Sequence, residues 1–476
     1  MTRKNVEIDR EKLSGADDLP LIVVGAGACG MVAALAAAKR GARVLLLEKG
    51  EELAGNTVRS TGLIPAAGAR FQRDAGILDD TPERMARDIF QKNNHESDPE
   101  LTRLLCEGSA PLVEWLADEA GCEMVCYTDF LYPGQSRLRM HGPKTHYGSE
   151  LARQLENAIR NEPGIELAKS TAVRNLTWDG TRVSGVETAD GNVAAGAVIL
   201  ALNGFGGNRE MVEEHLGPEA AAALYYGSPN NTGEGIRWGV ALGAATGHMG
   251  SYQGHASVAA PDGPLVTWGV IVNGAVLVNR EGRRFGDEMA GYSEYAGAVM
   301  AQPGGEAWEI FDEEVYGASR GTRFEEVVEA GKVVRSGTLE ELAAAFGLPA
   351  SALVETIEET NRSARGEAPD PFGREEFGGG PLEPPFYGIH VRGALFHTQG
   401  GLEVDTRARV LRLDGSCIPG LYAGGGTAMG ISGKGYKSYS SGNGLLAATV
   451  LGKIAGEAAA GELVGEDATR PSSTMP

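Results

Sequence analysis

The sequence predicts an α/β fold of Rossmann type built around a buried sheet, and three observations lead to this prediction. Residues 21–24 and 44–47 are short, continuous apolar runs, which is typical of strands buried on both faces. A glycine-rich turn and an alanine-rich segment of helical character, 31–39, lie between the two runs. Glycine makes up 69 of the 476 residues, roughly twice its usual share. Many glycines in mixed sequence indicate many places where the backbone approaches a ligand or takes a positive φ.

The turn after the first strand carries G-A-G-A-C-G at 25–30, and Glu48 ends the second strand. Strand, G-x-G-x-x-G turn, helix, strand and acid together form the dinucleotide-binding unit. Gly25 permits the tight turn, Gly27 lets backbone N–H groups approach a pyrophosphate, and Gly30 lets helix and strand pack closely. The helix N-terminus adds partial positive charge, and Glu48 is placed to accept hydrogen bonds from a ribose.

Helical and strand-like segments alternate along the rest of the chain. The expected helices lie within 81–120, near 323–331, at 338–362 and at about 443–460. The expected strands lie within 165–190, at 197–202 and near 419–426, with Asp190-Gly191 as a hairpin turn. Residues 250–395 have a different pattern, in which expected strands are mixed with expected helices. The polar end, 466–476, is expected to fray.

Composition excludes several classes of partner. The formal net charge of −21 repels nucleic acid and anionic membranes, so neither is expected to bind. No apolar run reaches the roughly 20 residues of a membrane span. Residues 1–20 carry neither an apolar signal core nor a twin-Arg signal. The five cysteines have no paired spacing, so neither disulfides nor a metal site is expected. These features favour a cytoplasmic protein.

Seven motifs follow one another in the chain. They are G-A-G-A-C-G at 25–30 with Glu48, G-N-T…S-T-G at 55–62, N-G-F-G at 203–206, T-G-E-G at 232–235, N-R-E-G-R-R-F-G-D-E at 279–288, H-T-Q-G-G at 397–401 and I-P-G-L-Y-A-G at 418–424. In this order they resemble the flavoprotein family of fumarate reductase, succinate dehydrogenase and 3-ketosteroid dehydrogenases, over about residues 18–462. The fumarate-type motif corresponding to 397–401 is H-T-M-G-G.

The resemblance implies bound FAD and a flavin domain that is split in sequence, at 1–249 and 397–476, by an inserted α+β capping domain at 250–396. The substrate would lie between the domains, against the flavin ring. Covalent members attach FAD through a histidine, and this chain has none between Gly50 and Gly68, so the FAD should be non-covalent. The implied FAD contacts are Gly25, Ala26, Gly27, Ala28, Gly30, Glu48, Lys49, Asn56, Thr57, Ser60, Thr61, Gly62, Val173, Asn203, Gly204, Gly425, Ser441 and Leu445.

Three features of fumarate chemistry are missing from the resembling motifs. Tyr292 stands where fumarate reductases carry the arginine that protonates carbon. Tyr436 stands where a second arginine clamps the substrate carboxylate, and Trp268 and Ile271 replace the glutamate and arginine of the proton relay. Arginine offers a carboxylate a bidentate fork, which tyrosine does not. The departures argue against reduction of a dicarboxylate.

At these two positions the chain resembles the ketosteroid dehydrogenases instead. Those enzymes carry tyrosine at the Tyr292 position, and some of their relatives have a G-Y-x-S motif that corresponds to residues 435–438 of this chain. The resemblance implies desaturation of the carbon–carbon bond next to a ketone, as in 3-ketosteroid or oxo-cyclohexane-carboxylate dehydrogenation. Tyr292 would accept the α proton while a hydride leaves to flavin N5. Tyr436 would donate to the carbonyl oxygen, with Ser438 nearby.

An ordinary tyrosine, with a pKa of about 10, is a poor base at pH 7, so Tyr292 would need a relay or a lowered pKa. Tyr295 is an available neighbour, as are Tyr127 or Tyr132 if the N-terminal segment folds over the site. The alternative is that these tyrosines only pack.

Two histidines point back toward acid-binding relatives. His397 and His255 stand where the family's substrate histidines stand, and ketosteroid dehydrogenases usually lack both. The substrate would then be a smaller keto compound with a polar or acidic group, unless the histidines only cap loops. The alternative functions are a flavin-dependent reductase of an α,β-unsaturated acid or ketone, and a flavin-binding protein without turnover. Substrate, direction, electron acceptor and oligomeric state stay open.

Overall fold

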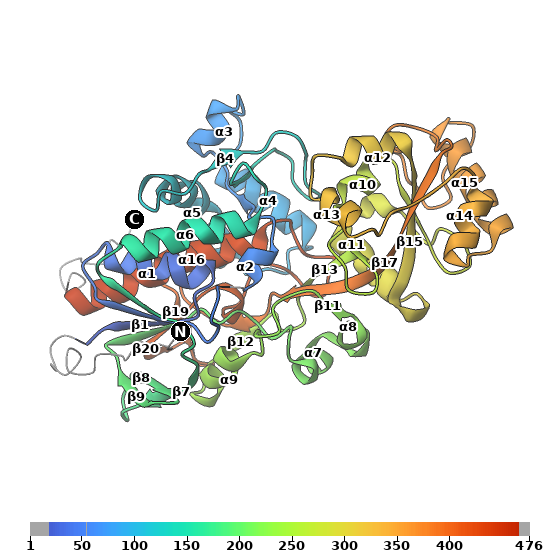
Figure 1. The fold of residues 1–476 in the computed structure, drawn as a ribbon. Helices are drawn as coiled ribbons and strands as arrows, with labels where there is room; N and C mark the ends of the chain where they lie inside the picture. Colours follow the sequence, from blue (N-terminus) through green and yellow to red (C-terminus); the bar gives the residue numbers. More distant parts are fainter. Residues whose placement is uncertain (1–18, 54, 466–476) are drawn as a thin grey trace, which may run out of the picture. The chain divides into compact units, whose positions relative to one another are not determined.

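The computed structural model describes residues 19–53 and 55–465, and these residues form two compact units (Figure 1). The first unit comprises the described residues up to Met211, Gly227–Ser251 and the described residues from His397 onward. The second comprises Val212–Tyr226 and Tyr252–Phe396. The first unit is therefore split in sequence by the second, and the predicted fold class is confirmed. Residues 212–226 join the second unit, whereas the expected capping domain began at residue 250.

The first unit is built on a six-stranded sheet with the strand order β19-β20-β10-β1-β2-β6. Strands β20, β10, β1, β2 and β6 run parallel, and β19 is an antiparallel edge strand. The bounds are β1 Leu21–Val24, β2 Val44–Leu47, β6 Ile165–Ala168, β10 Ala197–Leu200, β19 Arg409–Leu411 and β20 Cys417–Ala423. Every residue of β1, β2 and β10 is buried. The apolar runs in the sequence therefore form strands that are covered on both faces, as expected for a parallel sheet.

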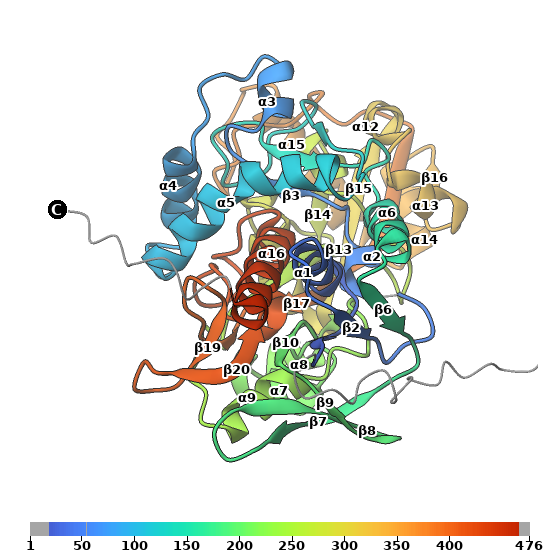
Figure 2. The same ribbon diagram turned by 90° about the vertical axis from the view of Figure 1, so that its left-hand side faces the viewer.

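Helices α1 (Ala28–Ala38) and α16 (Asn443–Val464) lie side by side over one face of this sheet (Figure 2). Glycines make this contact close, because a Cβ on Gly456 would lie 2.2 Å from the carbonyl oxygen of Ala33. The antiparallel strands β7 (Val173–Trp178), β8 (Val183–Thr188) and β9 (Gly191–Ala194) cover the other face. The predicted hairpin turn at Asp190-Gly191 is confirmed between β8 and β9.

The rest of the first unit surrounds this core. Its helices are α2 Asn56–Arg59, α3 Arg70–Asp74, α4 Pro82–Lys92, α5 Pro99–Asp118, α6 Gly148–Asn161, α9 Glu234–Ala241 and η4 Gly425–Thr427, with α7 (Arg209–Leu216) crossing the boundary at residue 211. Its remaining strands are β3 Ile64–Pro65, β4 Val125–Cys126, β5 Met140–Gly142, β12 Thr246–Gly247 and β18 Gly401–Leu402. The buried Arg139 donates to the carboxylates of Asp80 and Asp88, and so ties the residue before β5 to α4.

The second unit is an α+β unit around a sheet in the order β11-β17-β15-β14, with β13 and β16 also paired to β17. Its strands are β11 Leu224–Tyr225, β13 Tyr252–Ala259, β14 Val276–Val278, β15 Glu306–Asp312, β16 Val334–Ser336 and β17 Phe386–Thr398, which continues into the first unit at His397. Its helices are α8 Pro218–Ala222, α10 Gly269–Val272, η2 Glu288–Ala290, α11 Tyr292–Met300, η3 Pro303–Gly305, α12 Glu313–Ser319, α13 Phe324–Glu329, α14 Leu339–Phe346 and α15 Ala350–Ala364.

One expected helix is wrong in its continuity. The sequence predicts a single helical stretch over 338–362, but α14 ends at Gly347, which takes a left-handed conformation with a φ of +68°. Pro349 then precedes α15. The apolar period continues through both helices, and Gly-Leu-Pro breaks the backbone between them.

Within residues 19–53 and 55–465, no helix combines the length and apolarity needed to span a bilayer. The polar stretch 466–476, which is expected to fray, and residues 1–18 of the N-terminal segment lie outside the described residues.

Candidate active site

The glycine turn after β1 is folded too tightly for any other residue at two of its positions. Gly25 has a φ of +99°, and a Cβ there would lie 2.5 Å from the carbonyl oxygen of Ala201. A Cβ on Gly30 would lie 1.8 Å from the carbonyl oxygen of Gly25. Gly27 differs, because its φ is −74° and the nearest atom to a Cβ there is Thr57 Oγ1 at 3.8 Å. Its missing side chain leaves open space at the N-terminus of α1.

The expected FAD-contact residues at the end of β2 gather around this turn. The carboxylate of Glu48 accepts hydrogen bonds from Ala26 N at 2.9 Å and Gly50 N at 2.8 Å. Ala28 N donates to Thr57 Oγ1 at 3.0 Å. Lys49 forms an ion pair of 2.9 Å with Glu234, which begins α9 in the T-G-E-G motif. Four sequence-distant segments therefore converge where a dinucleotide would bind.

Two further expected contacts lie on neighbouring segments. Asn56 Oδ1 accepts hydrogen bonds from Ser228 N at 2.7 Å and from Asn231 Nδ2 at 3.0 Å. Val173 opens β7, and the nearby Thr171 N donates to the carbonyl oxygen of Glu48 at 2.8 Å. The structure therefore joins both the 55–62 motif and the start of β7 to this region.

The motifs at 55–62, 203–206 and 397–401 also form close turns. Gly62 N donates to Ser60 Oγ at 3.1 Å, and Gly62 has a φ of +74° beside Gly148. Asn203 takes a φ of +66°, and its carbonyl oxygen accepts from Thr427 Oγ1 at 2.9 Å. A Cβ on Gly204 would lie 2.0 Å from Thr398 Oγ1. Gly425, with a φ of +61°, approaches Cys29 of the glycine turn. Leu445 lies in the first turn of α16, where its carbonyl oxygen accepts a hydrogen bond from Thr449 Oγ1 at 2.6 Å, and Thr61 lies between Ser60 and Gly62.

Buried polar atoms without partners mark the start of α16. Both amide atoms of Asn443 and the hydroxyl of Ser440 have no hydrogen-bond partner among the described residues, although Asn443 is 1% exposed. Gln135 donates to the carbonyl oxygen of Ser441 at 3.1 Å, and its own Oε1 is also unpartnered. Such atoms call for a hydrogen-bond partner, a ligand or a water molecule, because an unsatisfied buried polar group costs about 1–3 kcal/mol. Beside a 22-residue helix N-terminus, they fit the polar edge of a flavin ring.

Asn443, Ser440 and Gln135 are not among the FAD contacts expected from the sequence. The pair Gly442-Asn443 before an apolar helix is a helix-start signal that points to this position. Nothing in the sequence indicates Gln135, because only the fold brings its loop to Ser441.

An aromatic cluster in the second unit contains four of the residues singled out in the sequence. Tyr292 begins α11 and stacks on His255, with ring centroids 5.1 Å apart at 19°. His255 also stacks on Phe396 at 5.2 Å and meets the edge of Trp268 at 6.0 Å. Tyr295 lies one turn further along α11, tilted against Trp268 at 6.4 Å. Its buried hydroxyl has no partner among the described residues, and burial raises its pKa.

His255 is a neutral imidazole. Ser257 N donates to His255 Nδ1 at 3.1 Å, so Nδ1 is an acceptor and the ring proton lies on Nε2. The pKa of His255 is lowered to about 3, mainly by burial and to a smaller extent by the charge of Arg323. Ser257 Oγ donates to Glu309, where burial raises the pKa of the carboxyl to about 7.

His397 has a similar environment in the first unit. Gln399 Nε2 lies 3.1 Å from His397 Nδ1, and the ring meets Tyr439 edge-on at a centroid distance of 5.5 Å. Burial lowers the pKa of His397 to about 4. Both histidines can therefore donate a hydrogen bond to an oxygen atom, and neither carries a charge at neutral pH.

Tyr436 and Ser438 lie on the loop 431–442 of the first unit. Gly435 N donates to the carbonyl oxygen of Gly250 at 2.9 Å, which holds this loop beside the end of the 227–251 segment. Lys437 Nζ lies 5.9 Å from the centroid of the Tyr436 ring. Ser438 is buried, and its hydroxyl donates to the carbonyl oxygen of Lys434 at 3.3 Å.

The two other tyrosines considered from the sequence are packed in the first unit. The hydroxyl of Tyr127 donates to the carbonyl oxygen of Pro143, and its ring stacks on His146 at 3.8 Å. Burial raises the pKa of both Tyr127 and Tyr132. These surroundings keep both phenols protonated, so they favour packing over a role as a base.

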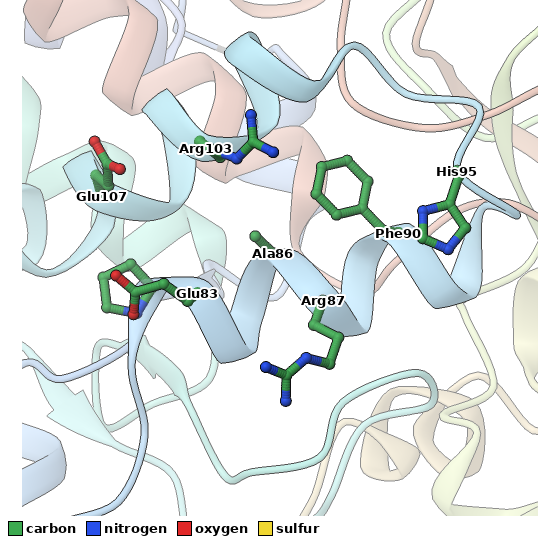
Figure 3. A pocket seen from close by; sticks show the side chains of 8 residues that line it. Glu83, Ala86, Arg87, Phe90, His95, Arg103 and Glu107 are labelled. Atoms are coloured by element: carbon green, nitrogen blue, oxygen red, sulfur yellow. The ribbon is translucent and has the colours of Figure 1, made fainter.

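A cavity of about 290 Å³ lies between α4 and α5 of the first unit (Figure 3). It is lined by Pro82, Glu83, Ala86, Arg87, Phe90, His95, Arg103 and Glu107. None of the residues expected in the active site lines it, and its two arginines are matched by two glutamates. The cavity is therefore lined by other residues than those of the candidate active site.

Comparisons with known proteins agree with this architecture. The family model described as "FAD binding domain" matches residues 21–445. The chain is 31% identical to a fumarate reductase (cytochrome) of Shewanella frigidimarina over 93% of its own length and 77% of that protein. It is 30% identical to an NADH:fumarate oxidoreductase of Klebsiella pneumoniae over 92% of its own length, and spans 47% of that longer protein.

Solved structures give the same result. A flavocytochrome c3 fumarate reductase in an open conformation matches with a TM-score of 0.81 and 28% identity, over 98% of this chain and 83% of that chain. A 3-ketosteroid-delta4-(5alpha)-dehydrogenase from Rhodococcus jostii matches with a TM-score of 0.73 and 26% identity, over 94% and 98%. The chain therefore belongs to the FAD binding domain family, in the fumarate reductase and succinate dehydrogenase flavoprotein superfamily, and is an FAD-dependent oxidoreductase that acts on CH–CH groups.

Proposed function

We propose that this chain is a flavin-dependent reductase of an α,β-unsaturated acid or ketone, with Tyr292 as the proton donor. FAD, when bound, supplies the two electrons as a hydride at N5. The greater similarity to fumarate reductases, in identity and in TM-score, supports reduction over desaturation. The residues at the start of α16 and around the glycine turn would hold the cofactor. The absence of a histidine between Gly50 and Gly68 supports non-covalent attachment.

The observation that carries the proposal is the stacking of Tyr292 on a neutral histidine in an aromatic cluster. An ordinary phenol keeps its proton at neutral pH, with a pKa of about 10. It can therefore donate that proton to the α carbon without any shift, whereas desaturation requires it to act as a base. The surroundings of the neighbouring Tyr295 also favour the protonated phenol, because burial raises its pKa.

The proposed substrate contacts are hydrogen-bond donors. His255 in the second unit, and His397 and Tyr436 in the first unit, each offer a donor that a carbonyl or carboxylate oxygen can accept. This hydrogen bonding polarises the conjugated double bond and stabilises the negative charge that develops on the oxygen.

Desaturation of a ketone is the second candidate function. Tyrosine at both positions where arginine is expected, and G-Y-K-S at 435–438, favour this candidate. In this direction Tyr292 would accept the α proton, and Tyr436 would donate to the ketone oxygen. Both candidates use the same residues and differ in direction and in substrate.

Anaerobic half-reactions separate the two candidates. The dithionite-reduced holoenzyme should be reoxidised by α,β-unsaturated compounds, tested with fumarate, urocanate, a cinnamate and a cyclohexenone. The oxidised holoenzyme should be bleached slowly or not at all by a saturated 3-ketosteroid or cyclohexanone. The reverse pattern, rapid bleaching by a saturated ketone without reoxidation by any unsaturated compound, would replace the reductase with the desaturase.

A further inference from the structure

His397 is held by a glutamine where the fumarate-type motif carries methionine. Gln399 Nε2 lies 3.1 Å from His397 Nδ1, and Gln399 Oε1 accepts a hydrogen bond from Ser432 Oγ at 3.1 Å. Gln399 is 4% exposed and Ser432 is fully buried, so water does not compete strongly for either bond. A methionine at this position would make neither bond.

The position of the Gln399 side chain follows from its backbone contacts. Its backbone N donates to the carbonyl oxygen of Ser251 at 2.8 Å, and its carbonyl oxygen accepts from Gly430 N at 2.8 Å. The side chain therefore leaves a fixed backbone position. The structure places the amide oxygen toward Ser432 Oγ and the amide NH₂ group toward His397 Nδ1.

This orientation decides which ring nitrogen of His397 carries the proton. Nδ1 also lies 3.4 Å from the carbonyl oxygen of Thr398, but this contact is longer than the Gln399 contact and weak at that length. A ring nitrogen that accepts a hydrogen bond is unprotonated, so the neutral ring carries its proton on Nε2. Tyr439 is the titratable group facing the ring, and burial raises its pKa to about 12, so it adds no charge at neutral pH.

We propose that Gln399 is a positioning residue that holds His397 as the neutral Nε2–H tautomer, and thereby makes Nε2 a hydrogen-bond donor to a substrate oxygen. The proposal rests on the proposed function, because it assumes that His397 faces the substrate. A neutral N–H donor can bind a ketone oxygen or a carboxylate oxygen, and the bond to a carboxylate is about twice as strong because that acceptor is charged. The positioning role of Gln399 therefore applies to both kinds of oxygen in the proposed class of substrates.

The first test is the protonation state of His397 in the holoenzyme. In ¹⁵N-histidine-labelled protein at pH 7, long-range ¹H–¹⁵N correlation spectra should show His397 protonated at Nε2 and unprotonated at Nδ1. The variant His397→Asn identifies the signals. A proton on Nδ1, or on both nitrogens, would overturn the proposal.

Two substitutions of Gln399 should move the tautomer. Gln399→Met removes the donor and should populate the Nδ1–H form, which can then use the Thr398 carbonyl oxygen. Gln399→Glu places an acceptor at Nδ1, so the ring should carry a proton there. Ser432→Ala is a smaller change that should act in the same direction as Gln399→Met. Gln91→Met, at an exposed glutamine of α4, is the matched control and should leave the spectrum unchanged.

Ligand binding tests the positioning role. Dissociation constants of a cyclohexenone and of a cinnamate are measured from the flavin absorbance change. Gln399→Met should weaken both ligands by about tenfold, the equivalent of one hydrogen bond, while kcat changes less than KM. Unchanged affinity for both ligands would overturn the positioning role of Gln399.

The two proposals fail differently. If the spectra show the Nε2–H tautomer and its loss in Gln399→Met, the positioning role of Gln399 is supported even when no unsaturated compound reoxidises the enzyme. If turnover is observed but the tautomer is the same in wild type and Gln399→Met, the proposed function stands and the role of Gln399 is wrong.

Discussion

At the scale of single residues, the chemistry depends on protonation states that neighbouring groups determine. Tyr292 stacks on His255, and the backbone N–H of Ser257 fixes the tautomer of that histidine. Glu309 is the other titratable group in this network, at full burial. Substitution of Tyr292 and of Glu309 tests these two features separately, the first through catalysis and the second through stability.

Tyr292→Phe should abolish reduction and retain the cofactor. The phenyl ring preserves the stacking on His255, so the packing of α11 against β13 stays the same. Loss of the proton donor should lower kcat by about 10² to 10⁴, the usual contribution of a general acid. Steady-state rates give kcat, and the ratio of flavin absorbance to protein gives FAD content. Full activity in this variant would remove Tyr292 from the mechanism.

Glu309→Gln should stabilise the protein at high pH. The folded pKa of about 7 exceeds the ordinary value of 4.5, so the folded state binds more protons than the unfolded state between these pH values. The stability contributed by the protonated carboxyl is therefore complete below about pH 4.5 and is lost as pH rises through 7. The glutamine keeps an acceptor for Ser257 and does not ionise.

The gain in melting temperature over wild type should be small at pH 5, should grow as the pH rises through about 7, and should then stay constant up to pH 9. Glu375→Gln, at an exposed carboxylate, is the matched control and should show no such pH dependence. A constant difference between Glu309→Gln and wild type from pH 5 to 9 would contradict the raised pKa.

At the scale of elements, the cofactor site consists of turns and helix ends that leave space or leave polar atoms unpaired. In the glycine turn, Gly25 and Gly30 are required by close backbone approach, whereas Gly27 faces open space. At the start of α16, the buried side-chain amide of Asn443 has no hydrogen-bond partner in the part of the chain that the structure describes. Both features cost stability or chain entropy in the protein alone, which a bound dinucleotide would offset.

The alanine variants of the glycine turn should separate folding from cofactor binding. In Gly27→Ala the new methyl group meets no described atom closer than 3.8 Å, so the protein should fold and melt as the wild-type apoprotein does. The methyl group occupies the space for the pyrophosphate, so FAD binding should fall by at least tenfold. Gly30→Ala places a Cβ 1.8 Å from a backbone oxygen and should impair folding itself. Equal FAD affinity in Gly27→Ala and wild type would contradict the assignment of this turn.

Asn443→Ala should weaken FAD binding without destabilising the apoprotein. The substitution removes two buried polar atoms that have no partner among the described residues, so the apoprotein should melt at the same temperature or higher. FAD affinity, measured by fluorescence titration, should fall by about tenfold, as expected for a lost hydrogen bond. A lower melting temperature of the apoprotein with unchanged FAD affinity would mean that Asn443 is structural.

At the scale of the whole molecule, one chain forms two compact units, and the first is assembled from segments distant in sequence. The expected FAD-contact residues include the turns after β1 and β2, the helix α2 and the start of α16, which are far apart in the chain. A ligand that bridges such segments stabilises only the folded state. Cofactor binding should therefore stabilise the folded state of the first unit against unfolding.

Removal of FAD should lower the melting temperature, and added FAD should restore it. Above the dissociation constant, the free energy of unfolding should grow by about 1.4 kcal/mol for each tenfold increase in FAD concentration. The melting temperature should rise with it. Differential scanning calorimetry of apoprotein at several FAD concentrations measures this dependence. ADP, which lacks the flavin ring, is the control for binding at the glycine turn alone. A melting temperature that is independent of FAD would contradict the proposed site.

The sequence alone determined the α/β class and the split first domain, and it predicted the FAD-binding role of the glycine turn, because these depend on local patterns and on the order of motifs. Apolar runs gave buried parallel strands, and glycines marked turns where a Cβ cannot fit. The local pattern was insufficient where the backbone of a helix breaks while the apolar period of the sequence continues, as at Gly347 between α14 and α15.

Only the tertiary structure decided the states of the reacting groups. The neutral tautomers of His255 and His397 depend on donors from Ser257 and Gln399, and Gln399 in turn accepts a hydrogen bond from Ser432. The unpaired atoms of Asn443 likewise become visible only when the surrounding chain buries them. The physical reason is that a pKa, a tautomer or an unsatisfied hydrogen bond is a property of the surroundings of a group, and those surroundings come from segments far apart in the sequence.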